Sequence, residues 1–396
     1  MPDIRTEYVT SSGFSGKSPK NEPEIILDTL TSEADILSLE PEWEGLLNDP
    51  GQRNVFLTWE WISTWLPCFG DDCSLRFVTA RTSNERALLG IAPLAIYAHQ
   101  SRRFLTLKVL SFVGRELAPD HVDFLIRTGH EKRVAATFLD WILNSREHWD
   151  FLMLDGLSAS SPLVPLLESG PAMRWHHTHE SRCPFLSLPG DFSTWMSGLS
   201  KKRRYKIRNS RRQLESAYPE QVCIRRVSTG AELVPALATL VQLHQSVRDS
   251  HHTGNAFRSE KLVSFHRRLC TCFLDKGWLR LYLLSAGETD IAAVYCFHYR
   301  GIVSFYSTGY HGDFSEFSPG MLLLVHAIRE SIEAGATTFD FLRGDEPYKY
   351  FYAGLCRKDL HIRVPTTASG LLAVGFYHIA RERIRPLVNS LISRPR

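Results

Sequence analysis

The stretch IVSFYSTGYHGDFSEFSPGMLLLVHAIRESIEAGATTFDFLR (302–343) decides the fold class. It begins with a predicted strand over 302–310. Ser318-Pro319-Gly320 then opens a predicted helix, because serine favours the N-cap and proline favours the first helical position. Gly335 ends that helix, and a further strand is predicted over 337–343. The segment therefore predicts a sheet with helices packed against it.

The first half of the chain has a similar order of elements. Short β-type runs precede a predicted helix at 131–146, and the apolar strand WDFLMLDGL (149–157) leaves on Asp155-Gly156, much as FDFLRGD (339–345) ends later. Two such halves predict an α+β chain with two folds in tandem, each a mixed, mostly antiparallel sheet flanked by helices. We place the domains at 24–190 and 191–365, between a flexible N-terminal tail (1–23) and a basic C-terminal segment (366–396).

Composition sets broad limits on the class of protein. The chain has 396 residues, of which 43% are apolar and 22% are charged. It is long enough for two or three domains, and it is not mainly disordered, collagen-like or a disulfide-stapled mini-protein. The net charge of +3 is too small to indicate nucleic-acid or membrane binding by the whole surface, so any basic patch must be local.

The cysteines and the N-terminus indicate the compartment. The eight cysteines form no C-x-x-C pair, which favours free thiols in a reducing environment. The N-terminus lacks the apolar core of a secretory signal, and no run of about 18 apolar residues would span a bilayer. We therefore expect a cytoplasmic protein.

The mouth of the predicted helix at Ser318-Pro319-Gly320 is the first candidate site. First-turn N–H groups point outward there with the positive end of the helix dipole behind them, and Gly320 removes any Cβ near the mouth. Such a mouth suits an anion such as a pyrophosphate. The alternative is a well-capped core helix that binds nothing.

The loop after the strand at 337–343 is the second candidate site. It lies beyond the carboxyl end of a strand, where open sheets tend to bind ligands. Within eight positions it carries four charged groups and two phenols, namely Arg343, Asp345, Glu346, Tyr348, Lys349 and Tyr350. The alternative is a surface turn with solvated charges.

The helix predicted over about 191–217 is the third candidate. Its residues 201–212 contain eight Lys and Arg and no acid. Eight uncompensated charges repel one another, so this face predicts an anionic partner: a phosphate-rich ligand, an anionic membrane or RNA. The alternative is a solvated helix.

Two further groups are weaker. The histidine clusters at 176–179 and 251–252 lack the spacing of zinc ligands, so we expect no metal site. Asp120 and His121 stand at the start of a predicted strand, and we expect them to line a groove between the two halves.

The runs YSTGYHGDFSEFSPGMLLLVHAI (306–328) and FDFLRGDEPYKY (339–350) resemble the Gcn5-related N-acetyltransferase (GNAT) superfamily. Together with WEWISTW, the APL strand, the DGL turn and LSKKRRYKIR, they are more narrowly similar to the CelD-like acetyltransferases of cellulose biosynthesis, which have a BioF2-like acyltransferase domain. The resemblance implies tandem GNAT-type folds, as in the related Fem peptidyl transferases. It also implies acyl transfer to an amine from a coenzyme A thioester such as acetyl-CoA.

One departure from the superfamily concerns the donor. The usual pyrophosphate loop, R/Q-x-x-G-x-G/A, is reduced here to Ser318-Pro319-Gly320. An aminoacyl or acyl carrier is therefore an alternative donor. Two other functions stay open: a Fem-like enzyme that uses aminoacyl-tRNA and holds RNA on 201–212, and a non-catalytic scaffold of a polysaccharide synthase.

Acyl transfer to an amine needs a base, donors for the thioester oxyanion and an acid for the leaving thiolate. We expect Glu346 or Asp345 as the base and Tyr348 or Tyr350 as the acid, with backbone N–H groups near Ser307–Tyr310 holding the oxyanion. Tyr310 and residues 318–320 would bind the donor. Arg343 and Lys349 would fix an anionic part of the donor or of a small-molecule or glycan amine acceptor.

Overall fold

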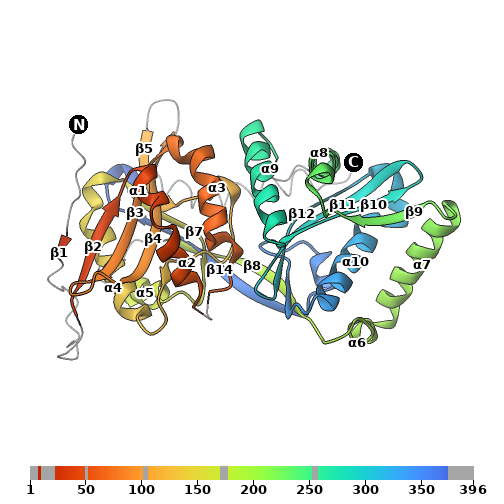
Figure 1. Cartoon of the computed structure of the whole chain (residues 1–396), viewed down its shortest axis with the longest axis horizontal. Coiled ribbons are helices and arrows are strands. Elements are labelled where there is room, and N and C mark those ends of the chain that lie inside the picture. Colours follow the sequence, from red (N-terminus) through yellow and green to blue (C-terminus); the bar gives the residue numbers. More distant parts are fainter. Residues whose placement is uncertain are drawn as a thin grey trace. The chain divides into compact units, whose positions relative to one another are not determined.

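The computed structural model describes residues 8–9, 23–49, 52–100, 106–169, 177–251 and 257–372 (Figure 1). Most of the predicted N-terminal tail and basic C-terminal segment lies outside these residues, as do His176 and His252. The chain forms two compact units. We call residues 1–52, 56–181 and 358–396 the first unit, and residues 53–55 and 182–357 the second unit.

These units differ from the predicted domains at both boundaries. Residues 358–365 were placed in the second domain, but they belong to the first unit because β14 (Leu355–Pro365) pairs with β7 (Phe151–Ser158). Residues 182–190 belong to the second unit because β8 (His177–Ser187) pairs with β13 (Thr338–Asp340). Each unit thus completes its sheet with a strand that is distant in the sequence.

The sheet of the first unit has the strand order β1-β2-β3-β4-β5-β7-β14, and β6 pairs with β4. Every neighbouring pair is antiparallel except β5 and β7, which are parallel. The remaining strands are β1 (Tyr8–Val9), β2 (Ile25–Leu30), β3 (Cys73–Thr82), β4 (Leu88–Gln100), β5 (Thr106–Phe112) and β6 (Leu125–Ile126).

Five α-helices of the first unit are described: α1 (Glu33–Leu37), α2 (Glu40–Leu47), α3 (Trp59–Phe69), α4 (Glu131–Asn144) and α5 (Leu163–Ser169). Thr58 caps α3 by accepting from the Trp61 N–H. Pro67 lies inside the last turn of this helix. The buried Trp43 of α2 anchors the core, and its indole N–H donates to the Leu57 carbonyl at 2.9 Å.

The sheet of the second unit has the strand order β8-β13-β12-β11-β10-β9. Only β12 and β13 are parallel in it. Its other strands are β9 (Val222–Arg226), β10 (Leu279–Ala286), β11 (Thr289–Tyr299) and β12 (Ile302–Tyr310), and its α-helices are α6 (Phe192–Gly198), α7 (Lys201–Ala217), α8 (Gly230–His251), α9 (Glu260–Asp275) and α10 (Pro319–Glu333).

Helices cover both faces of this sheet, α8 and α9 on one and α10 on the other (Figure 1). Strand β11 shows why, because it is apolar on both sides. Val294 and Cys296 belong to the core cluster that includes α10, whereas Tyr295 packs edge-on against His266 of α9 at a centroid distance of 5.8 Å. The predicted helix at 191–217 is two helices, because Ser200 starts α7 as its N-cap.

The predicted fold class is confirmed: the chain is α+β, and each unit is a mixed, mostly antiparallel sheet flanked by helices. None of the helices within the described residues combines the length and the apolarity that crossing a bilayer requires.

Candidate active site

The parallel strands β12 and β13 form the frame of the site. Their ladder has three pairs, Ile302↔Thr338, Val303↔Phe339 and Ser304↔Asp340. Beyond Ser304, β12 continues to Tyr310 with β11 as its neighbour, whereas β13 ends at Asp340 and turns into the loop. The two parallel strands therefore separate at their carboxyl ends.

Strand β12 is irregular where it leaves β13. Its register with β11 shifts between Tyr295↔Ser307 and Cys296↔Phe305, so Tyr306 is an extra residue of a bulge. The His244 Nδ1 of α8 lies 3.0 Å from the Ser307 Oγ and 2.9 Å from the Thr308 carbonyl oxygen. A bulge takes backbone groups out of the regular ladder, and this one occurs beside a buried histidine.

The mouth of α10 follows the end of β12. Pro319 is at the first helical position, as predicted, but Ser318 does not cap the helix with its side chain. Its backbone is left-handed, with φ 52°, and its side chain accepts no capping hydrogen bond from the first turn. Gly320 lies against Tyr310, since a Cβ built on it would be 3.6 Å from the Tyr310 Cδ1. The four residues predicted to bind the donor are thus together.

Lys349 holds the loop after β13 together. Its side chain is 5% exposed, and its ammonium contacts the Arg343 carbonyl at 2.6 Å, the Leu342 carbonyl at 3.4 Å and the Glu346 Oε2 at 3.0 Å. An ammonium has three N–H groups, and three acceptors of the loop surround this one. Lys349 was predicted to bind substrate, but it is turned inward and positions the loop instead.

Asp345 and Tyr350 contact each other at the outer side of the loop. The Tyr350 hydroxyl donates to the Asp345 carboxylate, and the Arg182 Nε lies 3.7 Å from the same carboxylate. The hydrogen bond to Asp345 raises the pKa of Tyr350 to about 12. Tyr350 therefore holds its proton more tightly than an ordinary phenol and suits the role of an acid less well than predicted.

Glu346 and Tyr348 are exposed functional groups of the loop, as is Asp345. The Glu346 side chain is 53% exposed although it contacts Lys349, and Tyr348 is 44% exposed. Arg343 is partly buried. Beneath them, the buried Asp340 accepts from the Leu342 N–H at 2.9 Å and pairs with Arg357 at 3.1 Å, which fixes the point where the loop begins.

Asp120 and His121 lie in the first unit. Asp120 is buried. The His121 Nδ1 lies 2.7 Å from the Asp359 Oδ1, and its backbone N–H donates to the Asp359 Oδ2 at 2.8 Å. These bonds fix His121 at φ 56°, a conformation that non-glycine residues rarely adopt. Both hydrogen bonds join residues of the first unit.

The basic helix α7 keeps most of its cations in solvent. Arg203 is partly buried and donates to the Tyr350 carbonyl at 3.0 Å, which links α7 to the end of the loop. Arg211 pairs with Glu215 at 2.7 Å. The exposed members of the cluster are Lys201, Lys202, Lys206, Arg208, Arg211 and Arg212. They form the surface that we call the basic face.

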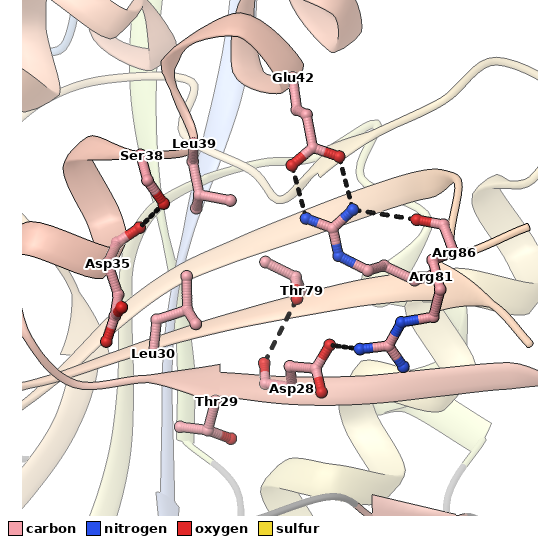
Figure 2. A pocket seen from close by; sticks show the side chains of 10 residues that line it. All are labelled: Asp28, Thr29, Leu30, Asp35, Ser38, Leu39, Glu42, Thr79, Arg81 and Arg86. Atoms are coloured by element: carbon pink, nitrogen blue, oxygen red, sulfur yellow. Dashed lines mark hydrogen bonds and ion pairs between the residues drawn. The ribbon is translucent and has the colours of Figure 1, made fainter. Parts of the chain in front are cut away.

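The first unit also has a pocket of about 400 Å³ (Figure 2). Arg81 forms two bonds with Glu42, one of them at 2.6 Å, and Arg86 pairs with Asp28 at 2.7 Å. Figure 2 shows both guanidinium groups turned to these carboxylates. The cations of the pocket are already neutralised by the chain, so we assign it no role.

Sequence reasoning missed two groups of polar side chains. His244 and His266 are buried beside the bulge of β12, and only their apolar neighbours in the sequence hinted at burial. In β14, the polar residues Asp359, His361 and Arg363 alternate with apolar ones. That alternation predicts a strand with one polar face.

Comparison with known proteins agrees with this geometry. Residues 201–350 match the family model described as an acetyltransferase (GNAT) domain. A structure of FemX is similar in fold, with a TM-score of 0.55 and 10% identity over 81% of this chain and 94% of that chain. A conserved protein of unknown function from Bacteroides thetaiotaomicron VPI-5482 has a TM-score of 0.50 and 11% identity over 85% of this chain and 99% of that chain.

A search of curated proteins found no match to the sequence. At these identities the solved structures establish likeness of fold, and the family model covers the part of the chain that holds the β12–β13 frame, α10 and most of the loop. The predicted tandem arrangement is confirmed, because each unit has an antiparallel run, a helix and a strand added in parallel. Residues 201–350 of the second unit are similar to GNAT acetyltransferase domains.

Proposed function

We propose that the second unit is an N-acyltransferase that moves an acyl group from a coenzyme A thioester to an amine. One observation supports this most strongly: the separating ends of β12 and β13 lie between a bulge on one side and an acid-bearing loop on the other. The match of residues 201–350 to a GNAT acetyltransferase domain supports the same reaction class. Acetyl-CoA is the donor to test first.

We assign the coenzyme A donor to the mouth of α10. The first intrahelical bond runs from the Leu322 N–H to the Ser318 carbonyl, so the N–H groups of Gly320 and Met321 precede it. Since the Ser318 side chain does not cap the helix, we assign these groups and the helix dipole to the pyrophosphate of coenzyme A. We assign the thioester oxygen, on which negative charge develops, to backbone N–H groups near Ser307–Tyr310, where β12 continues after its bulge.

The chemistry requires proton transfer in two directions. The Glu346 carboxylate is the better base, because Asp345 is bound by both Tyr350 and Arg182. It takes the ammonium proton, the free amine attacks the thioester carbon, and the C–S bond breaks. Tyr348 is the better acid for the leaving thiolate, because Tyr350 already donates its proton to Asp345.

Turnover of acid-substituted variants tests the proposal. The assay is release of free thiol from acetyl-CoA, with glucosamine as a probe amine. We expect Glu346→Gln to lower turnover by about 10²-fold or more, as loss of a general base does. Asp345→Asn should lower it less. The control is Asp313→Asn, an 88% exposed carboxylate of the same unit.

Two results would contradict the assignment. If Glu346→Gln and Asp345→Asn both keep full activity, the loop takes no part in catalysis. If no amine, including polysaccharide-linked glycan amines, is acylated and acetyl-CoA does not bind, the enzyme proposal fails. Binding of a polysaccharide synthase without any affinity for acetyl-CoA would then support the scaffold, and with it a link to cellulose or exopolysaccharide synthesis.

A Fem-like reaction from aminoacyl-tRNA is the second candidate. The fold likeness to FemX and the exposed basic face of α7 favour it. RNA bound by this face should lose affinity steeply with salt, because each phosphate contact releases a counterion. Binding of tRNA that falls by at least tenfold between about 50 and 200 mM salt, and that Lys206→Ala combined with Arg208→Ala weakens, would support it. An anionic membrane is tested with vesicles of phosphatidylglycerol and the same variants.

A further inference from the structure

The first-unit residues of three neighbouring strands, β7, β14 and β8, form a row of polar side chains that the proposed function does not use. The His361 Nδ1 of β14 lies 2.7 Å from the Asp155 Oδ1 of β7. The His361 Nε2 lies 2.8 Å from the Ser181 Oγ of β8. The strand order β7-β14-β8 places the histidine between the carboxylate and the hydroxyl.

A bulge aims Asp155 at this row. The pairs Leu360↔Leu157 and Ile362↔Leu154 leave Asp155 and Gly156 opposite the single residue His361. Gly156 has φ 73°, which glycine adopts without strain, so it supplies the left-handed residue that the bulge needs. Asp155-Gly156 was predicted as the end of the strand, but β7 continues through it to Ser158.

The hydrogen bonds assign the protons of the row. Asp155 is bound by the Arg363 Nη2 through both oxygens, at 2.7 and 2.9 Å, which keeps it a carboxylate that only accepts. In the tautomer that serves a base, the imidazole of His361 donates from Nδ1 to Asp155. Its Nε2 is left as an acceptor, and the Ser181 hydroxyl donates to it. This is the proton arrangement of a serine nucleophile with its base.

The row is accessible from solvent at its ends although its centre is buried. His361 and Arg363 are 5% exposed, whereas Ser181 is partly exposed and the Asp155 side chain is 30% exposed. His179 stacks on His361 with ring centroids 4.3 Å apart and fixes the plane of the imidazole.

We propose that the first unit carries a second acyl-transfer site in which Ser181 is the nucleophile, His361 the general base and Asp155 the residue that orients it. The substrate class is an activated acyl ester or thioester, since an activated serine attacks an acyl carbon. The site is separate from the loop of the second unit, and it does not depend on the proposed function.

The reaction balances without any other reactant than water or an amine. The Ser181 oxygen bonds to the acyl carbon while its proton passes to the His361 Nε2. The C–S or C–O bond to the leaving group then breaks, and that group leaves with the proton from His361. Water or an amine next attacks the acyl-serine, gives a proton to His361, and the serine oxygen recovers that proton as it leaves.

Covalent labelling of the full-length chain tests the site. The probes are a fluorophosphonate, which marks activated serines, and p-nitrophenyl acetate, which leaves an acetyl group. Peptide mass spectrometry should find the label on Ser181. Ser181→Ala should abolish it, and His361→Asn should slow labelling by about 10²-fold or more. The control is Ser160→Ala, which removes an exposed serine of the same unit. Ser181 of this variant should be labelled at the rate of the unsubstituted chain.

Failure of this inference is distinguishable from failure of the proposed function. A folded chain that shows no label on Ser181, or equal labelling rates with His361→Asn, would overturn it. Asp155→Asn provides a second measurement, because a misoriented imidazole should lower the labelling rate while circular dichroism stays unchanged. Glu346→Gln lies in the second unit and should leave labelling of Ser181 intact.

Discussion

The two units add a parallel strand to an antiparallel run in the same way, but they treat the end of that strand differently. In the first unit, β7 passes through its bulge and pairs with β14 from Phe151 to Ser158. In the second unit, β13 pairs with β8 over Thr338–Asp340 only, and the chain then leaves as a loop. One unit has a buried polar row at this position and the other has an acid-bearing loop.

The difference shows how one architecture provides two kinds of site. Asp155 and Asp340 both sit on the added strand and both pair with an arginine of β14, Arg363 and Arg357. A long ladder next to Asp155 brings in His361 and Ser181 from neighbouring strands. Because the ladder next to Asp340 is short, residues 343–350 form a loop, and the charged groups of this loop are close together in the sequence. Rigidity comes from strands in the first case and from Lys349 in the second.

Removing the buried cation of the first unit is expected to have the largest effect on this comparison. Arg363→Met leaves Asp155 without its guanidinium, and breaking a buried ion pair costs about 3 kcal/mol or more. Hydrogen exchange of the β7 and β14 amides measures the loss, with β10–β12 of the second unit as an internal control. Unchanged protection of β7 would show that the row does not stabilise the ladder.

Removing the buried cation of the second unit should cost less. Lys349→Met leaves two carbonyls and Glu346 without their donor, but Glu346 is half exposed and regains water. We expect a loss of about 2 kcal/mol in local stability and at least a tenfold loss of acyl transfer. Limited proteolysis of the loop and turnover measure the two effects. Full activity with a cleaved loop would contradict the positioning role.

The Asp123 carboxyl group of the first unit extends the comparison to the pH dependence of stability. Burial raises the pKa of Asp123 to about 7, above its unfolded value of about 3.9, so its contribution to stability is present below pH 4 and lost as pH rises through 7. Asp123→Asn can still accept from Ser161 and Phe124. The substitution should therefore stabilise the protein more at pH 8 than at pH 5, by on the order of 2 kcal/mol in the free energy of unfolding. Melting temperatures of both proteins at the two pH values measure this difference. Equal shifts at both pH values would contradict this.

Asp155 should respond to pH in the opposite direction. Its hydrogen bond with His361 and the charge of Arg363 lower its pKa despite the desolvation that opposes them. Its contribution is therefore present above pH 4 and lost as pH falls through its lowered pKa. Acid titration of hydrogen exchange in β7 checks this sign, and the Asp155→Asn variant should remove that part of the dependence.

The smallest expected effect concerns the bulge itself. Gly156→Ala forces a Cβ into a left-handed residue and should cost about 1 kcal/mol. It should also turn Asp155 away from His361 and slow labelling of Ser181. Gly190→Ala, at an exposed glycine with nothing within 4 Å of its Cβ, is the matched control. If Gly156→Ala left the labelling of Ser181 unaltered, the bulge would not be needed to orient Asp155 toward His361.

The sequence predicted the elements better than their partners. Apolar periodicity, Pro319 and Gly335 placed β12, α10 and β13 within a few residues, because these signals are local. The pairing of β14 with β7 joins residues about 200 positions apart, and no local pattern encodes it. The domain boundary at 365 separated His361 from Asp155 for that reason.

The sequence predicted which residues the loop brings together, and their catalytic roles stay predictions. The loop residues were chosen by their chemistry, and the structure brings Asp345 to Tyr350 and Glu346 to Lys349. Which side chain points inward depends on Gly344, with φ 128°, and on Leu342, with φ 55°. A left-handed leucine has no sequence signal, so the burial of Lys349 was not predictable.

Binding of acetyl-CoA is the measurement that tests the central claim most directly. Isothermal titration into the full chain should show saturable binding. Gly320→Glu, which sets a negative charge at the mouth of α10, should abolish it, whereas Gly312→Glu, at an open position nearby in the sequence, should not. Absence of saturable binding, or equal affinity in both variants, would contradict a thioester donor at the mouth of α10.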